Sequence, residues 1–121
     1  MTSTEHGSAT VELALLVPLI VVLVVVVVEV AVVARSQIEL VAAAREGARV
    51  AATSPDPADA VRAVRDAMGE RGDDVQIGVH RPHVVGVEAA VDVALSHEIP
   101  VPLLGPFRVP LSARAVMAVE R

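Results

Sequence analysis

Residues 13–34 read LALLVPLIVVLVVVVVEVAVVA, an apolar run interrupted only by Pro18 and Glu29. A helix needs about 20 apolar residues to cross a bilayer. In residues 13–28, fourteen of sixteen side chains are Leu, Ile or Val. At roughly 0.4 kcal/mol each they favour insertion by about 6 kcal/mol, whereas one carboxylate at the bilayer centre costs about 3 kcal/mol. We therefore predict one transmembrane helix over residues 8–34.

The valine run at residues 24–28 would favour a strand in water, because β-branched side chains are stiff in a helix. A lone strand in lipid would leave its backbone N–H and C=O groups without hydrogen bonds, so a helix is expected there. Pro18 lies within the first two turns and is expected to bend the helix rather than end it.

The composition of the rest of the chain narrows the classes of function. The 121 residues suit one small domain, the formal net charge is −5, and all ten basic residues are Arg. An acidic chain without a basic cluster is not expected to bind nucleic acid. Phe107 is the single aromatic residue and there is no Cys, which excludes disulfides and thiol chemistry.

Two glutamates flank the apolar run, Glu12 and Glu29. They are seventeen residues apart, or about 26 Å along a helix, close to the roughly 30 Å of the hydrocarbon core. The simplest interpretation places each carboxylate near one membrane surface. In the alternative, Glu29 makes a contact with a partner helix inside the membrane.

The residues before the apolar run form a second motif, Gly7-Ser8-Ala9-Thr10-Val11-Glu12. It resembles a type IV prepilin processing site, where a membrane peptidase cuts after the Gly. Residues 1–7 would then be a leader, and Ser8 a new amino terminus. A helix would place Glu12 about 6 Å from that ammonium group. In a bundle of such helices, the carboxylate of one subunit would neutralise the ammonium of the next and set their register.

The segment after the span carries a further resemblance. Residues 43–49 read AAREGAR, and with the preceding motif and span they resemble the TadE-like family of pseudopilin-like proteins from tight-adherence (Flp) pilus systems. The resemblance implies a structural subunit of a type IVb pilus or related secretion machine. Its partners would be the bilayer, a prepilin peptidase, other pilin-like subunits and assembly proteins. Arg45, Glu46 and Arg49 are interpreted either as a solvated helix face or as a docking surface for another subunit.

The orientation in the membrane is predicted differently by two arguments. The resemblance implies an N-terminus in the cytoplasm and residues 35–121 outside the cytoplasmic (inner) membrane, or in an extracellular pilus after assembly. The arginines that follow the span, Arg35, Arg45 and Arg49, would by the positive-inside rule place the domain in the cytoplasm. We follow the resemblance, because two of these arginines lie ten or more residues beyond the span.

Two further interpretations of the N-terminal segment remain open. It could be a secretory signal cut after Ala34, although residues 1–7 lack the basic side chains of such a signal and the apolar run is long for one. It could also be the anchor of an unprocessed single-pass adaptor that presents a small binding domain to a partner protein.

Residues 35–121 are predicted to form an α+β, pilin-like domain. The long helix is expected to continue to Ala52 with Ile38, Val41 and Ala42 on its packed face. A second helix is expected over 57–68, capped by Asp56. It would cover a three-stranded antiparallel sheet with strands beginning near residues 75, 87 and 111. Residues 100–106 are expected to be a proline-rich loop.

No catalytic or cofactor site is expected. His80, His83 and His97 invite a metal-binding interpretation, but they fall at strand ends and in a turn without Cys or a convergent acidic group. There is no phosphate-binding glycine-rich loop and no readable nucleophile constellation. We therefore expect a protein that is not an enzyme, takes no cofactor and has no small-molecule substrate.

Overall fold

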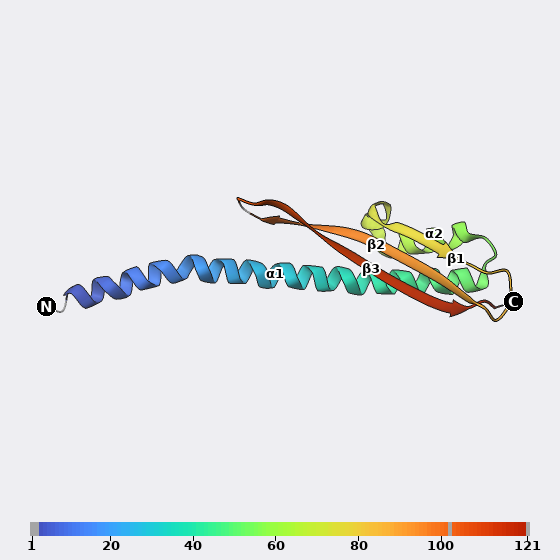
Figure 1. Cartoon of the computed structure of the whole chain (residues 1–121), viewed down its shortest axis with the longest axis horizontal. Coiled ribbons are helices and arrows are strands. Elements are labelled where there is room, and N and C mark those ends of the chain that lie inside the picture. The colour runs from blue at the N-terminus through green and yellow to red at the C-terminus, as the bar shows by residue number, and fades with distance from the viewer. Residues whose placement is uncertain (1–2, 102, 121) are drawn as a thin grey trace. The chain divides into compact units, whose positions relative to one another are not determined.

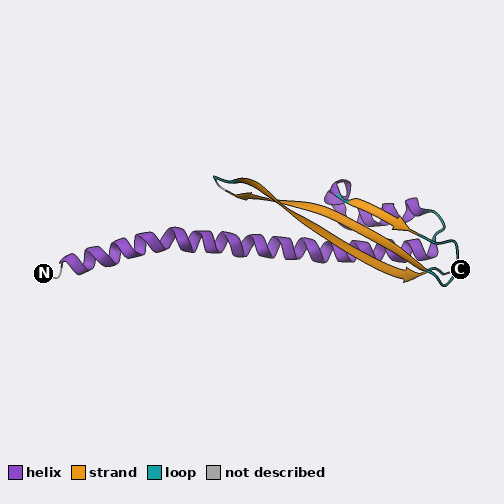
Figure 2. Ribbon diagram, in the orientation of Figure 1, coloured by secondary structure: helices purple, strands orange, loops and turns teal. Residues whose placement is uncertain are grey.

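The computed structural model describes residues 3–101 and 103–120. Its elements are α1 (Ser3–Thr53), α2 (Pro57–Met68), a 3₁₀ helix η1 (Gly69–Asp74), β1 (Gln76–His80), β2 (Glu88–Val101) and β3 (Gly105–Ala118) (Figure 1). The strands form one antiparallel sheet in the order β1-β2-β3 (Figure 2). The chain divides into two compact units, Met1–Val32 and Val33–Arg121. The predicted α+β class, with a long apolar helix, a second short helix and three strands, is confirmed.

In the first unit the structure describes one element, the part of α1 from Ser3 to Val32. The helix continues through Pro18 and through the valine run at 24–28, as predicted. It begins at Ser3, earlier than the expected start near Ser8. Among the described residues, this is the one helix whose length and apolar content suit a membrane span, and the apolar side chains of the run are exposed. A single N-terminal span of this kind is the feature of a single-pass membrane anchor.

In the second unit, the part of α1 after Val33 packs through small side chains. The buried positions repeat at helical spacing: Leu40, Ala43, Ala44, Gly47, Ala48 and Ala51. The expected face was wrong, since Ile38 is 70% exposed and Ala42 is exposed too. Small side chains let the backbones of neighbouring elements approach closely, and here that advantage exceeds the burial of one large apolar side chain.

The second helix begins and ends where the sequence predicts. The Asp56 carboxylate accepts a hydrogen bond from the Ala58 N–H at 2.9 Å, and Pro57 occupies the first turn. Ala60, Val64 and Met68 are buried on one face. Gly69, at a φ of 60°, ends the helix, because a positive φ suits glycine.

The sheet presents one face to the helices. Along β2 the inward positions are Ala89, Val91, Val93 and Leu95, all buried. They share one hydrophobic core with Leu40 of α1 and Val64 of α2. The alternation predicted for β2 is confirmed in these four residues, whereas Val87 precedes the strand and is exposed.

The expected proline-rich loop at 100–106 was wrong. The strands continue toward a short turn, and Pro100 pairs with Pro106 while Val101 pairs with Gly105. The turn itself requires positive φ values, 74° at Leu103 and 85° at Gly105. Proline is tolerated here because β1 pairs with β2 only over Ala90–Ala94, so at Pro100 and Pro106 each strand has one neighbour and a missing N–H need not break a ladder on both sides.

Residues distant in sequence form hydrogen bonds with both ends of the part of α1 that follows Val33. Near its start, the Gln37 side-chain amide donates to the Ser112 carbonyl at 2.8 Å. At its end, the Ala51 carbonyl accepts from the Arg81 Nε at 2.7 Å, and the Ala52 carbonyl accepts from the Glu120 N–H at 2.9 Å. The last carbonyls of a helix have no partner within the helix, so these bonds cap α1. They also fix the direction of β3, which runs from the Gln37 level to the Ala52 level.

Gly47→Ala tests the close packing of α1. A Cβ at this position would collide with the Val64 side chain and lie 3.1 Å from Val91 Cγ1. Overpacking costs about 1–3 kcal/mol, against a gain of about 1 kcal/mol in helix propensity. We expect a net loss of about 1 kcal/mol in the free energy of unfolding. The measurement is urea unfolding of the detergent-solubilised chain, followed by circular dichroism.

Gly78→Ala is the matched control, because its Cβ would meet only Asp92 Cβ at 3.8 Å. A glycine weakens a strand interior, so this variant should be as stable as the parent or more so. Equal destabilisation by both substitutions would contradict the packing argument.

Candidate functional site

The residues of the predicted processing site lie in the first turns of α1. Ser8 and Glu12 are one helical turn apart, about 6 Å along the axis, and therefore share a face. A Cβ added at Gly7 would find nothing within 4 Å, and Ser8 and Glu12 are exposed. The Gly7–Ser8 bond is helical here, although glycine favours a flexible backbone. A protease would first have to unwind this turn.

Glu29 lies in the same helix, but on a different side from Glu12. Seventeen residues at about 100° each leave the two carboxylates about 100° apart around the axis. Glu29 is partly shielded, whereas the apolar side chains around it are exposed. The two glutamates therefore cannot serve one helix face, and each would meet a different neighbour.

The AAREGAR segment divides into a buried and an exposed half. Ala44, Gly47 and Ala48 face the core, whereas Arg45 and Arg49, one turn apart, face solvent. This explains the pattern physically: the small residues admit α2 and β2, and the charged residues cover the opposite side. Of the two interpretations of Arg45, Glu46 and Arg49, the solvated helix face describes the exposed positions of Arg45 and Arg49, and the docking surface stays a prediction.

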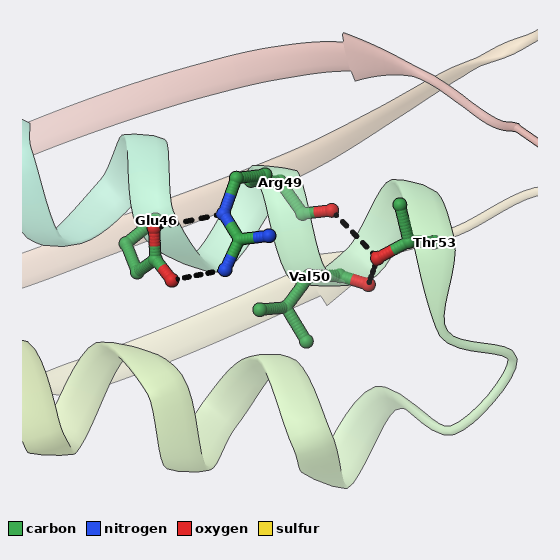
Figure 3. Close-up of polar contacts among 4 residues, drawn as sticks. All are labelled: Glu46, Arg49, Val50 and Thr53. Carbon is green, nitrogen blue, oxygen red and sulfur yellow. Dashed lines mark hydrogen bonds and ion pairs between the residues drawn. The ribbon is translucent and has the colours of Figure 1, made fainter.

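Glu46 and Arg49 form a two-bond ion pair on this exposed face (Figure 3). Arg49 donates through Nε to Glu46 Oε2 at 3.0 Å and through Nη2 to Oε1 at 2.6 Å. The hydrogen bond from Arg49 holds the pKa of Glu46 below its usual value, and Glu46 raises the pKa of Arg49. Both side chains are more than a third exposed, at 42% and 58%, so solvent screens the pair and it adds little to stability.

Arg45 differs from its two neighbours. It is exposed, and no hydrogen bond or ion pair of its side chain is found among residues 3–101 and 103–120. Of the three charged residues assigned to a docking surface, the structure brings two together and leaves Arg45 extended into solvent. A partner carboxylate could therefore bind Arg45 without breaking an existing pair.

Other polar contacts of the domain carry no signal in the sequence. Ser36 is 2% exposed, and its hydroxyl accepts a hydrogen bond from Arg71 Nη1 at 2.9 Å. Glu39 pairs with Arg35 at 3.0 Å and also lies 3.8 Å from Arg71. The Arg71 contacts join η1 to α1 across thirty-five positions of sequence, a separation that no local pattern indicates.

His80, His83 and His97 belong to no group of potential metal ligands among the described residues. No group of three or more His, Cys, Asp or Glu side chains converges in the described part of the chain. His80 ends β1 and His83 lies in the loop after it. His97, expected at a strand end, instead lies within β2 opposite Val109.

Comparison with protein families identifies one match. Residues 7–49 match the model of the TadE-like protein family, which confirms the resemblance drawn from the sequence. The matched segment begins at Gly7, contains the apolar run and ends at Arg49. It associates the chain with membrane proteins of the Tad pilus. No curated protein and no solved structure matches the chain.

Arg49→Ala tests the cause of the low Glu46 pKa. Removing the guanidinium should raise the pKa of the Glu46 carboxyl toward its ordinary value of 4.5, because the hydrogen bond to the charged form is lost. The measurement is an NMR titration of the side-chain carboxyl. Arg45→Ala is the control and should leave the Glu46 titration in place; an equal shift in both variants would mean that the general charge of the face, rather than the hydrogen bond, lowers the pKa.

Proposed function

We propose that the protein is a TadE-like pseudopilin or minor pilin, cut after Gly7 by a prepilin peptidase and built through α1 into a Tad pilus or a related secretion machine. Residues 1–7 would then be cytoplasmic and residues 35–121 would lie outside the inner membrane. The role is structural rather than enzymatic. The observation that carries the proposal is the position of Gly7 and Glu12 in the first turns of α1, directly before its apolar run and at the point where the family match begins.

The helical state of the Gly7–Ser8 bond is compatible with cleavage. The first N–H groups of a helix have no partners within it, so opening its first turns breaks few hydrogen bonds. Glycine also weakens a helix by about 1 kcal/mol relative to alanine. The helix that begins at Ser3 can therefore open locally to present the bond to a peptidase.

Cleavage would create a charge that Glu12 is placed to neutralise. The new ammonium of Ser8 would lie at the membrane surface, where an unpaired charge is costly. Glu12 is one turn away on the same helix face. In a bundle of subunits, pairing between the carboxylate of one helix and the ammonium of the next would fix their axial register.

The exposed face of AAREGAR supplies a second contact. Arg45, together with the Glu46–Arg49 pair, lies on solvent-facing positions of α1 within the matched segment. We assign this face to docking of another pilin-like subunit outside the membrane. Glu29, on a different side of the span from Glu12, is assigned to a contact with a neighbouring helix.

Processing is tested by intact mass of the membrane-extracted chain, expressed with and without a prepilin peptidase. We expect loss of residues 1–7 only when the peptidase is present. Gly7→Leu should abolish the loss, because a bulky side chain replaces the small residue at the cut, whereas Ala9→Leu serves as a nearby control that should still be cut. An uncut parent chain would favour the unprocessed adaptor, and loss of residues 1–34 would identify a secretory signal.

Glu12→Gln separates assembly from anchoring. The neutral amide keeps the size and the helix but cannot offset the Ser8 ammonium. We expect processing and membrane insertion to persist while cross-linking between subunits in the membrane falls by about tenfold, the equivalent of one lost charge pair of roughly 1.4 kcal/mol. Glu39→Gln, beyond the span, is the control; full cross-linking of the Glu12 variant would contradict the register role.

A further inference from the structure

The turn between β2 and β3 exposes a group of large apolar side chains. Leu103 is 105% exposed, Leu104 87% and Phe107 65%. β1 pairs with β2 only over Ala90–Ala94, so beyond Leu95 the sheet narrows to β2 and β3 alone. The apolar side chains therefore lie at the end of a two-stranded ribbon, remote from the core.

The ribbon end is also uncharged. Residues 99–107 read IPVPLLGPF, without a charged side chain. Charge returns at the next paired position, where Arg108 Nε bonds to Glu98 Oε1 at 2.7 Å. The ion pair separates an apolar tip, residues 99–107, from the polar strand surface behind it.

The direction of the tip follows from contacts within the domain. Ser112 lies at the level of Gln37 and Glu120 at the level of Ala52. Going from Glu120 toward the turn therefore means going along α1 toward Val33, which is the end at which the chain enters the apolar run. Figure 1 shows the β2–β3 turn at the end of the sheet opposite the C-terminus.

The reach of the ribbon can be estimated. The eight residues from Ser112 to Glu120 cover about 27 Å as a strand, and the fifteen residues from Gln37 to Ala52 cover about 22 Å as a helix. β3 therefore advances about 0.8 Å along the axis of α1 for each Å of its own length. Eight further residues lead from Ser112 to Leu104, so the turn lies well beyond the level of Gln37, in the direction of Val33.

We propose that the β2–β3 tip inserts into the interfacial region of the bilayer and forms a second membrane contact of the chain. The lipid is the occupant because the tip lies toward the Val33 end of its own unit, where the chain joins the apolar run, and because apolar side chains without charge suit the boundary between headgroups and acyl chains. The inference rests on the span at residues 13–34 but not on processing at Gly7.

The backbone of the tip fits the same environment. An open strand edge in lipid leaves unpaired N–H groups, which is costly. Residues 100, 102 and 106 are Pro and carry no N–H, so a third of the nine tip residues have no donor to leave unpaired. The same prolines disfavour addition of a strand from another protein. The Glu98–Arg108 pair would remain at headgroup level and limit the depth of insertion.

The experiment uses single tryptophans, because the chain contains no Trp or Tyr. Phe107→Trp is placed in the full chain in liposomes whose acyl chains are brominated and quench nearby indole fluorescence. We expect the brominated lipids to remove about half of the emission, with a blue shift, as for an amphipathic ring at the membrane interface.

Two further variants are matched controls. Val84 lies in the β1–β2 loop at the other end of the sheet, and its exposed fraction of 61% is similar to the 65% of Phe107. The emission of Val84→Trp should be unquenched. Val21→Trp lies in the span and should be quenched strongly. Leu103→Ser with Leu104→Ser, added to Phe107→Trp, should reduce its quenching about twofold or more by removing apolar anchors.

The outcomes separate the alternatives. Quenching of Phe107→Trp and Val21→Trp but not Val84→Trp supports insertion of the tip. If Phe107→Trp behaves like Val84→Trp while Val21→Trp is quenched, the tip lies in water and the proposal fails alone. A blue shift without quenching that grows with protein per vesicle would make a second copy the occupant and overturn the proposal. An unquenched Val21→Trp would overturn the membrane span and the tip contact together.

Discussion

Val64 of α2 and Val91 of β2 both press on the backbone of α1 at Gly47, where a Cβ has no room. This close approach lets a small domain with one aromatic residue build a core, because alanine and valine side chains interdigitate at short backbone distances. The hydrogen bonds from Arg81 and Glu120 to the last carbonyls of α1 hold the end of the helix in this packed position. The charged face of AAREGAR follows from this packing, since the side of α1 that is left over faces water.

The elements whose signals are local could be predicted from the sequence. The apolar run predicts a helix because lipid forbids an unpaired strand, and Asp56, Pro57 and Gly69 mark both ends of α2. Two predictions failed where tertiary context overrides a local preference. Ile38 is more apolar than any alanine, yet α1 buries its small residues because they allow closer contact. Pro100 and Pro106 predict a loop, but the two-stranded end of the sheet, where each strand has one neighbour, tolerates them.

The residues of the candidate site also divide into those that local sequence signals predict and those that only the tertiary structure brings together. The spacing of Gly7, Ser8 and Glu12 and the exposed positions of Arg45 and Arg49 follow from helical periodicity, so they could be read before the fold was known. The contact between Arg71 and Ser36 could not, because it joins residues thirty-five apart through the packing of η1. The helical state of the Gly7–Ser8 bond was also missed, since a glycine before an apolar run predicts a flexible segment and the helix starts at Ser3.

The free edge of β3 has a consequence for copies of the chain that are anchored together in one membrane. A strand of fourteen residues with one unpaired side is a template for aggregation, and confinement to a bilayer raises the frequency of encounters between copies. On this strand Pro106 and Pro110 interrupt the row of donors. Arg108 and Arg114 add charged side chains, each in an ion pair with an acidic residue of β2. A stored pool of the protein should thus resist cross-β association, and if the chain polymerises as proposed, growth would proceed through helices rather than through its sheet.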